Sequence, residues 1–105
     1  MTGSKLVRDR IPEIIRASGT EPTTYRAGPA EFRQRLRDKL LEEVDEFLTA
    51  DDGPIAVEEL ADILEVVYAL AADLGTTKDA LETTRAAKAA ERGAFADRVI
   101  WDAGS

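Results

Sequence analysis

Two long segments of the chain place apolar residues at the spacing of an α-helix. At about 100° per residue, the apolar positions between Pro29 and Ala50 fill one broad arc, and they are Phe32, Leu36, Leu40, Val44, Phe47 and Leu48. The segment from Pro54 to Leu74 is apolar around nearly its whole circumference, with a main stripe of Leu60, Leu64, Val67, Ala71 and Leu74. This pattern predicts two long helices, the second of which contacts more than one neighbour.

Turn and cap residues set the order of the elements. Asp51-Asp52-Gly53-Pro54 is typical of a tight turn, so the two long helices are expected to form an antiparallel hairpin. A short helix is predicted from about Arg10 to Ala17 with Asp9 as its N-cap, and a capping threonine opens a last helix that ends near Arg92. Residues 21–28 are predicted to be an extended connector, with a short strand as the alternative.

The predicted architecture is a single all-α domain over residues 1–105, a helical bundle built around the hairpin. A chain of 105 residues is small for two helices that are apolar over so much of their circumference. Part of that surface is therefore expected to meet another subunit, so that oligomerisation completes the bundle. Phe95, Val99, Ile100 and Trp101 form an apolar tail that is expected to dock on the bundle or on a partner.

Carboxylates interrupt the apolar faces of both long helices. Glu43 projects into the apolar arc of the first helix, and Glu46 lies at the edge of that arc. Glu42 and Asp45 are predicted to point away from the arc, as surface residues. Glu59 falls on the apolar flank of the second helix. A carboxylate in such surroundings must be protonated, paired with Arg or Lys, or bound to a cation, because an unpaired buried charge costs several kcal/mol.

Each long helix carries two carboxylates three residues apart, Glu43 with Glu46 and Glu59 with Asp62. Residues at positions i and i+3 share a helix face. In a hairpin, the carboxyl-terminal half of the first helix lies opposite the amino-terminal half of the second. The two pairs are therefore expected to face each other across an oxygen-rich pocket.

Composition narrows the chemistry of that pocket. The chain has no cysteine and no histidine, which excludes thiol catalysis, disulfides and imidazole as a base or ligand. Any metal would be held by oxygen, which favours Mg²⁺ or Mn²⁺. The net charge of −7 argues against binding to nucleic-acid polymers or anionic membranes. The chain lacks a long apolar run, so we expect no membrane span and a cytoplasmic protein.

Basic residues gather toward both ends of the chain. Lys5, Arg8 and Arg10 precede the first short helix. They are either charges on a flexible arm or part of an arm that folds over a phosphate at the acidic site. Lys88 and Arg92 lie four residues apart on the last predicted helix, so they share one of its faces.

Three blocks of sequence occur in a recognisable order. They are Lys5-Leu6-Val7-Arg8-Asp9-Arg10-Ile11-Pro12-Glu13-Ile14-Ile15, then Glu43-x-x-Glu46 and Glu59-x-x-Asp62 with a twelve-residue spacer, and finally Lys88-Ala89-Ala90-Glu91-Arg92-Gly93-Ala94-Phe95. In this order they resemble the all-α nucleoside triphosphate pyrophosphohydrolases, the MazG-like and phosphoribosyl-ATP pyrophosphohydrolase-like superfamily. The resemblance covers nearly the whole chain.

This resemblance implies hydrolysis of a nucleotide between its α and β phosphates, giving a monophosphate and pyrophosphate. It also implies homodimers or homotetramers with sites at or near subunit interfaces. The expected cofactor is Mg²⁺, with Mn²⁺ as the alternative, and the implied metal ligands are Glu43, Glu46, Glu59 and Asp62.

The residue inventory suits this reaction, because phosphoanhydride hydrolysis needs charge neutralisation and a positioned water more than covalent help from the protein. Glu43 and Glu46 are the candidate catalytic residues, with Glu46 as the acceptor of the water's proton. Phosphate contacts are predicted for Lys5, Arg8, Lys88 and Arg92, because ammonium and guanidinium groups both suit phosphate oxygens.

The leading interpretation is a house-cleaning enzyme that removes non-standard or surplus nucleoside triphosphates. Within the same chemistry, the alternative is hydrolysis of phosphoribosyl-ATP in histidine biosynthesis. A different class of function is a non-catalytic helical module that binds a nucleotide or a protein as a regulator. No motif in the chain identifies a preferred base or sugar.

Overall fold

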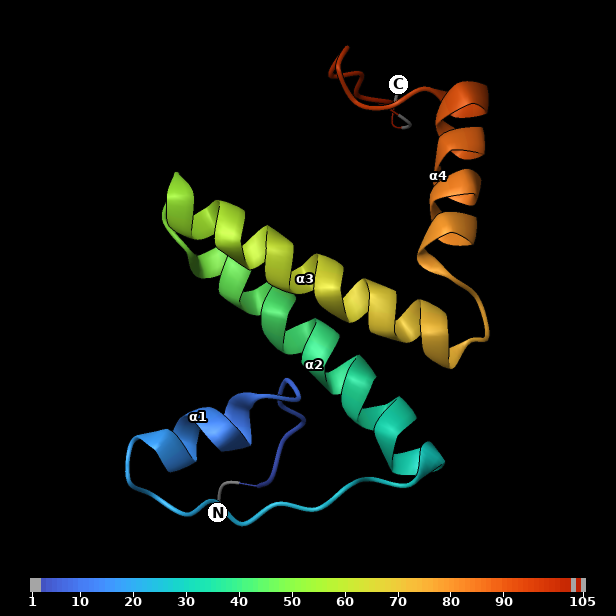
Figure 1. Cartoon of the computed structure of the whole chain (residues 1–105). Helices are drawn as coiled ribbons and strands as arrows, with labels where there is room; N and C mark the ends of the chain where they lie inside the picture. The colour runs from blue at the N-terminus through green and yellow to red at the C-terminus, as the bar shows by residue number, and fades with distance from the viewer. Residues whose placement is uncertain (1–2, 103, 105) are drawn as a thin grey trace.

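The computed structural model describes residues 3–102 and residue 104, and its regular structure is entirely helical (Figure 1). The helices are α1 (Ile11–Ala17), α2 (Pro29–Thr49), α3 (Pro54–Asp73) and α4 (Lys78–Arg92). No strand occurs in the described part of the chain, so residues 20–28 form an irregular connector. The all-α fold class predicted from the sequence is confirmed.

The helix boundaries follow from local chemistry. Pro29 and Pro54 open α2 and α3, where a backbone N–H would have no partner within the helix. Gly53, ahead of α3, has a φ of 102°, which residues with side chains rarely adopt. The hydroxyl oxygen of Thr77 caps α4 by accepting a hydrogen bond from the N–H of Ala80 at 3.0 Å.

Helix α1 differs slightly from the expectation. It begins at Ile11, and its N-cap is Arg10 in place of Asp9. None of the described side chains caps this helix end. Pro12 lies in the first turn, where its fixed backbone angle suits a helix start, so the proline compensates for the missing cap.

Helices α2 and α3 pack side by side and antiparallel (Figure 1). The guanidinium of Arg33, near the start of α2, donates a hydrogen bond to the carboxylate of Asp73 at the end of α3, at 2.9 Å. The buried residues of this pair include Leu36 and Glu43 on α2 and Val66 on α3. The hairpin therefore encloses a small core that contains a carboxylate.

The face of α3 that turns toward α2 is not its main apolar stripe. Glu59 and Asp62 on the inward face approach Glu43 of α2. Leu60 and Leu64, on the main stripe, keep 49% and 48% of their surface exposed. Both faces of α3 are apolar, and the inward one is the face that carries the carboxylates. The amino-terminal part of the main stripe is left open in the single chain, whereas Ala71, farther along the same stripe, is buried.

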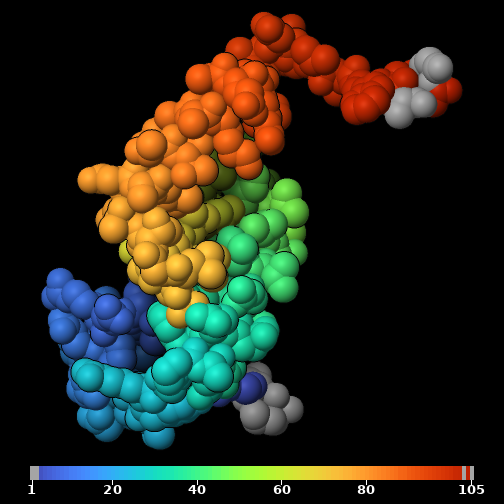
Figure 2. Space-filling model, turned by 90° about the vertical axis from the view of Figure 1, so that its right-hand side faces the viewer, coloured from blue at the N-terminus to red at the C-terminus, as the bar shows by residue number. Residues whose placement is uncertain are grey.

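Helix α4 turns away from the hairpin, and among the described helices it contacts α3 alone (Figures 1 and 2). The ammonium group of Lys78 lies 4.7 Å from the ring centroid of Tyr68, a cation–π contact that joins α4 to α3. In Figure 2 the chain after α4 projects beyond the rest of the molecule. Its large apolar side chains are 83–94% exposed, and they are Phe95, Val99, Ile100 and Trp101. The expected docking of this tail on its own bundle does not occur.

Residues 3–10, here called the N-terminal arm, cross the hairpin. Polar contacts between three pairs of residues hold the arm in place. Arg35 donates a hydrogen bond to the backbone oxygen of Ser4 at 2.8 Å, and the ammonium of Lys5 lies 3.4 Å from the carboxylate of Glu42. The third contact joins Arg8 to α3 through Asp62. Of the two interpretations of this basic segment, the structure favours the folded arm.

None of the helices in the described residues combines the length and the apolarity that crossing a membrane requires.

Candidate active site

Carboxylates from α2 and α3 converge on one region of the hairpin. Glu43, Glu59 and Asp62 each offer an oxygen, and these oxygens all lie within 4.8 Å of one another. Glu42, Glu43 and Glu46 form a second group with the same spacing. Glu43 belongs to both groups, so the four carboxylates predicted from the sequence meet around it, together with Glu42.

Glu43 is the most enclosed of these acids. It is 6% exposed, and one of its oxygens lies 3.3 Å from the ammonium of Lys39. Its other oxygen, Oε1, is buried and has no hydrogen-bond partner among the described residues. A buried carboxylate oxygen without a partner is strongly unfavourable, and a divalent cation is the kind of ligand that would satisfy it. Hard cations such as Mg²⁺ prefer oxygen ligands, so the donor set fits this metal.

The surroundings of Glu59 in the cluster raise its pKa above the ordinary value. Burial raises the pKa of Glu59, and a hydrogen bond shared with Glu46 raises it further, as do the negative charges of Asp62 and Glu43. Without a cation, the cluster therefore resists full ionisation. A cation held between these carboxylates would reverse that effect.

Lys39 and Glu42 lie directly beside Glu43, although the sequence pattern did not place them at the site. Burial alone would lower the pKa of Lys39, but hydrogen bonds and attraction from Glu42 and Glu43 outweigh burial and hold the pKa above its ordinary value. Burial would likewise raise the pKa of Glu42, but Lys39 and Lys5 keep it below its ordinary value. The expectation that Glu42 points away into solvent is wrong. The signal was present in the spacing, because Lys39 lies three and four residues before Glu42 and Glu43.

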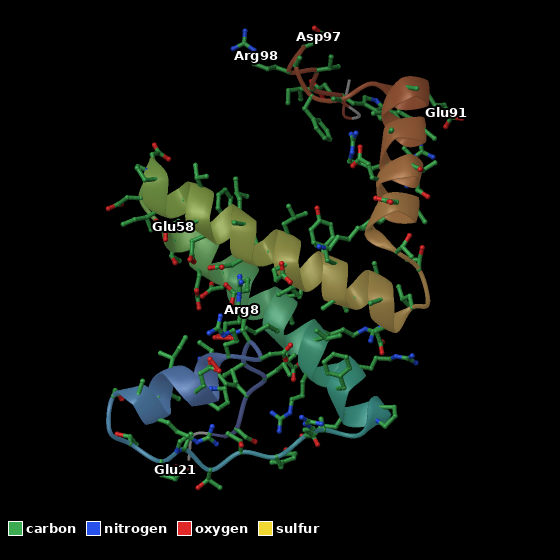
Figure 3. The ribbon with its side chains drawn as sticks, viewed as in Figure 1. Arg8, Glu21, Glu58, Glu91, Asp97 and Arg98 are labelled. Atoms are coloured by element: carbon green, nitrogen blue, oxygen red, sulfur yellow. The ribbon has the colours of Figure 1, made fainter. Side chains whose placement is uncertain are left out.

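Two of the predicted phosphate ligands approach the acidic cluster. A guanidinium nitrogen of Arg8 lies 2.7 Å from an oxygen of Asp62, and Figure 3 shows Arg8 reaching from the arm toward the hairpin. Lys5 reaches the edge of the cluster through Glu42. The arm therefore places two positive charges beside the acidic cluster.

The other two predicted phosphate ligands lie elsewhere. Lys88 and Arg92 are on α4, which leaves the hairpin at the far end of α3 (Figure 1). The guanidinium of Arg92 lies 3.4 Å from the carboxylate of its neighbour Glu91. A single chain thus does not bring Lys88 and Arg92 to the acidic cluster.

A small groove continues from the cluster along the hairpin. Its volume is about 230 Å³, and its walls include Glu43 and Asp62 from the cluster. Leu6 and Val7 of the arm form one side. A larger open groove of about 1000 Å³ lies beyond the arm and is lined by the arm, part of α1, the connector and the start of α2.

Comparison with known proteins places the chain in a family. The family model for phosphoribosyl-ATP pyrophosphohydrolase matches residues 10–90. The chain belongs to the phosphoribosyl-ATP pyrophosphohydrolase family. The matched region contains the whole hairpin and all the carboxylates of the cluster, but it excludes Lys5, Arg8 and Arg92.

One curated relative of this family member is an uncharacterized protein from Mycolicibacterium smegmatis. The two are 47% identical over 55 residues, which is 52% of this chain and 56% of the relative. The match thus spans only about half of the relative's length. No solved structure matches the chain.

Proposed function

We propose that the protein hydrolyses nucleoside triphosphates between the α and β phosphates, with Mg²⁺ as cofactor, and releases a nucleoside monophosphate and pyrophosphate. The observation that carries this proposal is the convergence of the carboxylates of Glu43, Glu59 and Asp62, together with the buried oxygen of Glu43 that has no hydrogen-bond partner among the described residues. Family membership supports pyrophosphohydrolase chemistry for such a site. A regulator without catalysis would have no need of this buried, unsatisfied charge.

In this proposal Glu43, Glu59 and Asp62 hold the cation, and Glu46 completes the set from the more exposed edge. Mn²⁺ would suit the same oxygen ligands. When bound, the cation neutralises phosphate oxygens and favours ionisation of the attacking water.

The protein's own groups carry the remaining steps. Glu46 is exposed, so it can exchange protons with solvent, and we assign to it the proton of the attacking water. Lys5 and Arg8 bind the phosphates, which requires Arg8 to exchange its contact with Asp62 for a phosphate oxygen. Lys39 stays with Glu42 and Glu43 and holds α2's carboxylates in place.

Two substrate classes are compatible with the family. The first is surplus or non-standard nucleoside triphosphates, a house-cleaning role, and the second is phosphoribosyl-ATP. Both contain the same α–β phosphoanhydride, so the site chemistry described above serves either. Comparing the kcat/KM values of the two substrate classes, measured with one enzyme preparation, shows which of them the protein prefers.

The test is to incubate the protein and Mg²⁺ with a panel of canonical and modified nucleoside triphosphates and phosphoribosyl-ATP, and to identify products by ³¹P NMR. Pyrophosphate together with a monophosphate is the expected result. Orthophosphate with a diphosphate would contradict cleavage between the α and β phosphates. Binding of a nucleotide without any turnover would favour the regulator.

We further propose that the protein is a homodimer or a larger homo-oligomer. The chain exposes 8948 Å², whereas a compact monomer of 11.4 kDa exposes about 5,800 Å². Its radius of gyration is 17.8 Å, against about 13 Å for a compact domain of this length. The difference in area is on the scale that permanent subunit interfaces bury.

Such an assembly gives Lys88 and Arg92 a role. They lie on a helix that contacts α3 but turns away from the acidic cluster, so we assign them to the phosphates of a substrate bound at a second copy. The exposed apolar stripe of α3 and the exposed tail supply surfaces for that contact.

A further inference from the structure

The small groove beside the acidic cluster runs along the hairpin away from the metal ligands. The residues of α2 that line the groove share one helix face, and toward the start of the helix they are Glu43, Lys39, Leu36 and Phe32. At 1.5 Å per residue, that path is about 16 Å long. A substrate whose phosphates lie at the carboxylates can therefore extend its other end into this groove.

The groove has apolar walls on opposite sides. Leu36 and Val66 of the hairpin are buried and form its floor with Phe32. Leu6 and Val7 of the N-terminal arm cover it. Its volume of about 230 Å³ is below the range of about 300–1,000 Å³ that is usual for whole ligands, so it suits one flat ring system.

From this geometry we infer that the groove between the N-terminal arm and the hairpin binds the heterocyclic base of the nucleotide. The inference rests on the proposed function, because it takes the cluster of Glu43 and Asp62 as the phosphate end of the substrate. The base lies between the arm and Phe32, where both faces of the ring are shielded from water.

The polar groups of the groove define the class of base. Lys39, Glu43, Arg8 and Asp62 already pair with other charges. Among the described residues, the side chains of the two remaining groups, Asp9 and Glu65, have no hydrogen-bond or ion-pair partner; both are carboxylates on the groove wall. Ionised carboxylates only accept hydrogen bonds, so they suit a base edge that donates.

Glu65 is the better placed of the two, because it lies one helical turn beyond Asp62, on the side away from Glu59. Bases with an exocyclic amino group, such as cytosine and adenine, present that donor. Their oxo counterparts, uracil and hypoxanthine, present a carbonyl oxygen at the same position. Uracil and hypoxanthine still present a ring N–H, so the selection depends on a carboxylate that faces the exocyclic position, where it accepts from an amino group and is repelled by a carbonyl oxygen. We assign this specificity-determining role to Glu65, which gives the site a preference for amino-bearing bases.

Ala69 offers a way to fill the groove without touching the metal ligands. It lies on the wall one turn past Glu65, and leucine at this position would occupy the space of the base. The matched control is Ala72→Leu, on the exposed surface of the same helix. The probes, titrated calorimetrically with Mg²⁺, are cytidine and uridine monophosphates, adenosine and inosine monophosphates, and pyrophosphate alone.

The expected result for Ala69→Leu is a loss of about tenfold or more in affinity for all four monophosphates, with pyrophosphate bound as in the wild type. Ala72→Leu is expected to match the wild type. Unchanged monophosphate affinity in Ala69→Leu would overturn the base site. If the wild type does not bind pyrophosphate, the result would instead contradict the proposed function. The two failures are therefore distinguishable.

Glu65→Gln keeps the surface helix intact and tests the same site if leucine at position 69 disturbs folding. An amide both donates and accepts hydrogen bonds. The wild type is expected to prefer cytidine over uridine monophosphate and adenosine over inosine monophosphate by about tenfold, and Glu65→Gln to reduce both ratios toward unity. Ratios unchanged by Glu65→Gln, or absent in the wild type, would refute the assignment of Glu65.

Discussion

Glu43 is a buried carboxylate, and among the described residues only one of its two oxygens has a polar partner. Lys39 neutralises one oxygen at 3.3 Å, while Oε1 is left without a partner among the residues that the structure describes. The sequence pattern pointed to this residue, because Glu43 interrupts the apolar arc of α2. The pattern did not reveal that Lys39 would pair with the buried carboxylate of Glu43, since a lysine four residues away is usually a surface ion-pair partner.

Replacing Glu59 with Gln should stabilise the metal-free protein and weaken its response to Mg²⁺. The substitution removes one negative charge that Glu46, Asp62 and Glu43 repel. We expect a higher Tm in EDTA than the wild type has, and a Mg²⁺ dissociation constant that is larger by about tenfold or more. Differential scanning fluorimetry with and without Mg²⁺ measures both.

The control for this variant is Glu58→Gln. Glu58 is exposed at the start of α3 and belongs to neither carboxylate group (Figure 3). It should leave the Mg²⁺ response unchanged. A lower Tm for Glu59→Gln in EDTA would show that the carboxylate is stabilised by contacts other than a cation.

Glu46→Gln should separate catalysis from metal binding. Glu46 lies outside the group formed by Glu43, Glu59 and Asp62 and is exposed, so its loss should affect proton transfer more than affinity for Mg²⁺. We expect kcat to fall by about 10²-fold or more while the Mg²⁺ dissociation constant changes less than about tenfold. Asp45→Asn is the neighbouring control. Equal losses in kcat and Mg²⁺ affinity would make Glu46 a metal ligand only.

Among the elements, the N-terminal arm depends on polar contacts more than on packing. Open grooves lie on both sides of it, and Arg8 ties it to α3 through Asp62. An arm held this way can release Asp62 and turn Arg8 to a phosphate at small energetic cost. In the proposed function, the arm would thereby link the carboxylates of the cluster to the substrate.

Arg8→Gln should weaken substrate binding and leave stability nearly unchanged. Both partners of the ion pair are partly exposed, at 57% and 38%, so the pair contributes less than about 1 kcal/mol to folding. Glutamine has no charge to offer a phosphate oxygen, so the variant should raise KM by about tenfold. Steady-state kinetics and urea unfolding measure the two effects.

Arg10→Gln is the matched control, because Arg10 lies on the same arm and pairs with Glu13. We expect its KM to equal that of the wild type. If Arg8→Gln and Arg10→Gln raise KM equally, the arm acts through its net charge and not through a contact of Arg8.

The elements themselves were largely readable from the sequence. Pro29 and Pro54 mark helix starts, Gly75 and Gly93 follow the ends of α3 and α4, and the i, i+3 spacing of the carboxylates predicted which residues would meet. The inward face of α3 was not readable, because Leu60 and Leu64 make the outward face as apolar as the inward one. Periodicity alone cannot rank two apolar faces; contacts with α2 decide between them.

At the scale of the whole molecule, the single chain is too open to be complete. The stripe of α3 and the exposed tail both present apolar surface that water should drive into contact. Helix periodicity and chain length predicted this excess and pointed to the tail, but they could not tell which face of α3 would be left open.

If α4 serves the site of a second copy, two inactive variants should restore each other's activity. Glu43→Gln lacks the acidic site, and the double variant K88A/R92A lacks the phosphate contacts. A mixed dimer contains one site with both parts intact. Random mixing should therefore recover about a quarter of wild-type pyrophosphate release, because half of the dimers are mixed and each has one working site.

Light scattering provides the control for that experiment. The protein is expected to have at least twice the chain mass of 11.4 kDa, and the mixed sample should have the same mass. Mixed dimers without recovered activity would place Lys88 and Arg92 outside the site. A monomer at micromolar concentration would contradict the assembly altogether.

We propose that the carboxylates around Glu43 hold the cation that supports hydrolysis. The most direct measurement is pyrophosphate release from the best substrate of the panel, by wild type and Glu43→Gln, in Mg²⁺ and in EDTA. We predict turnover by the wild type in Mg²⁺ only, and a loss of about 10²-fold or more in Glu43→Gln. Turnover by the wild type in EDTA, or full activity in a folded Glu43→Gln, would contradict this account of the site.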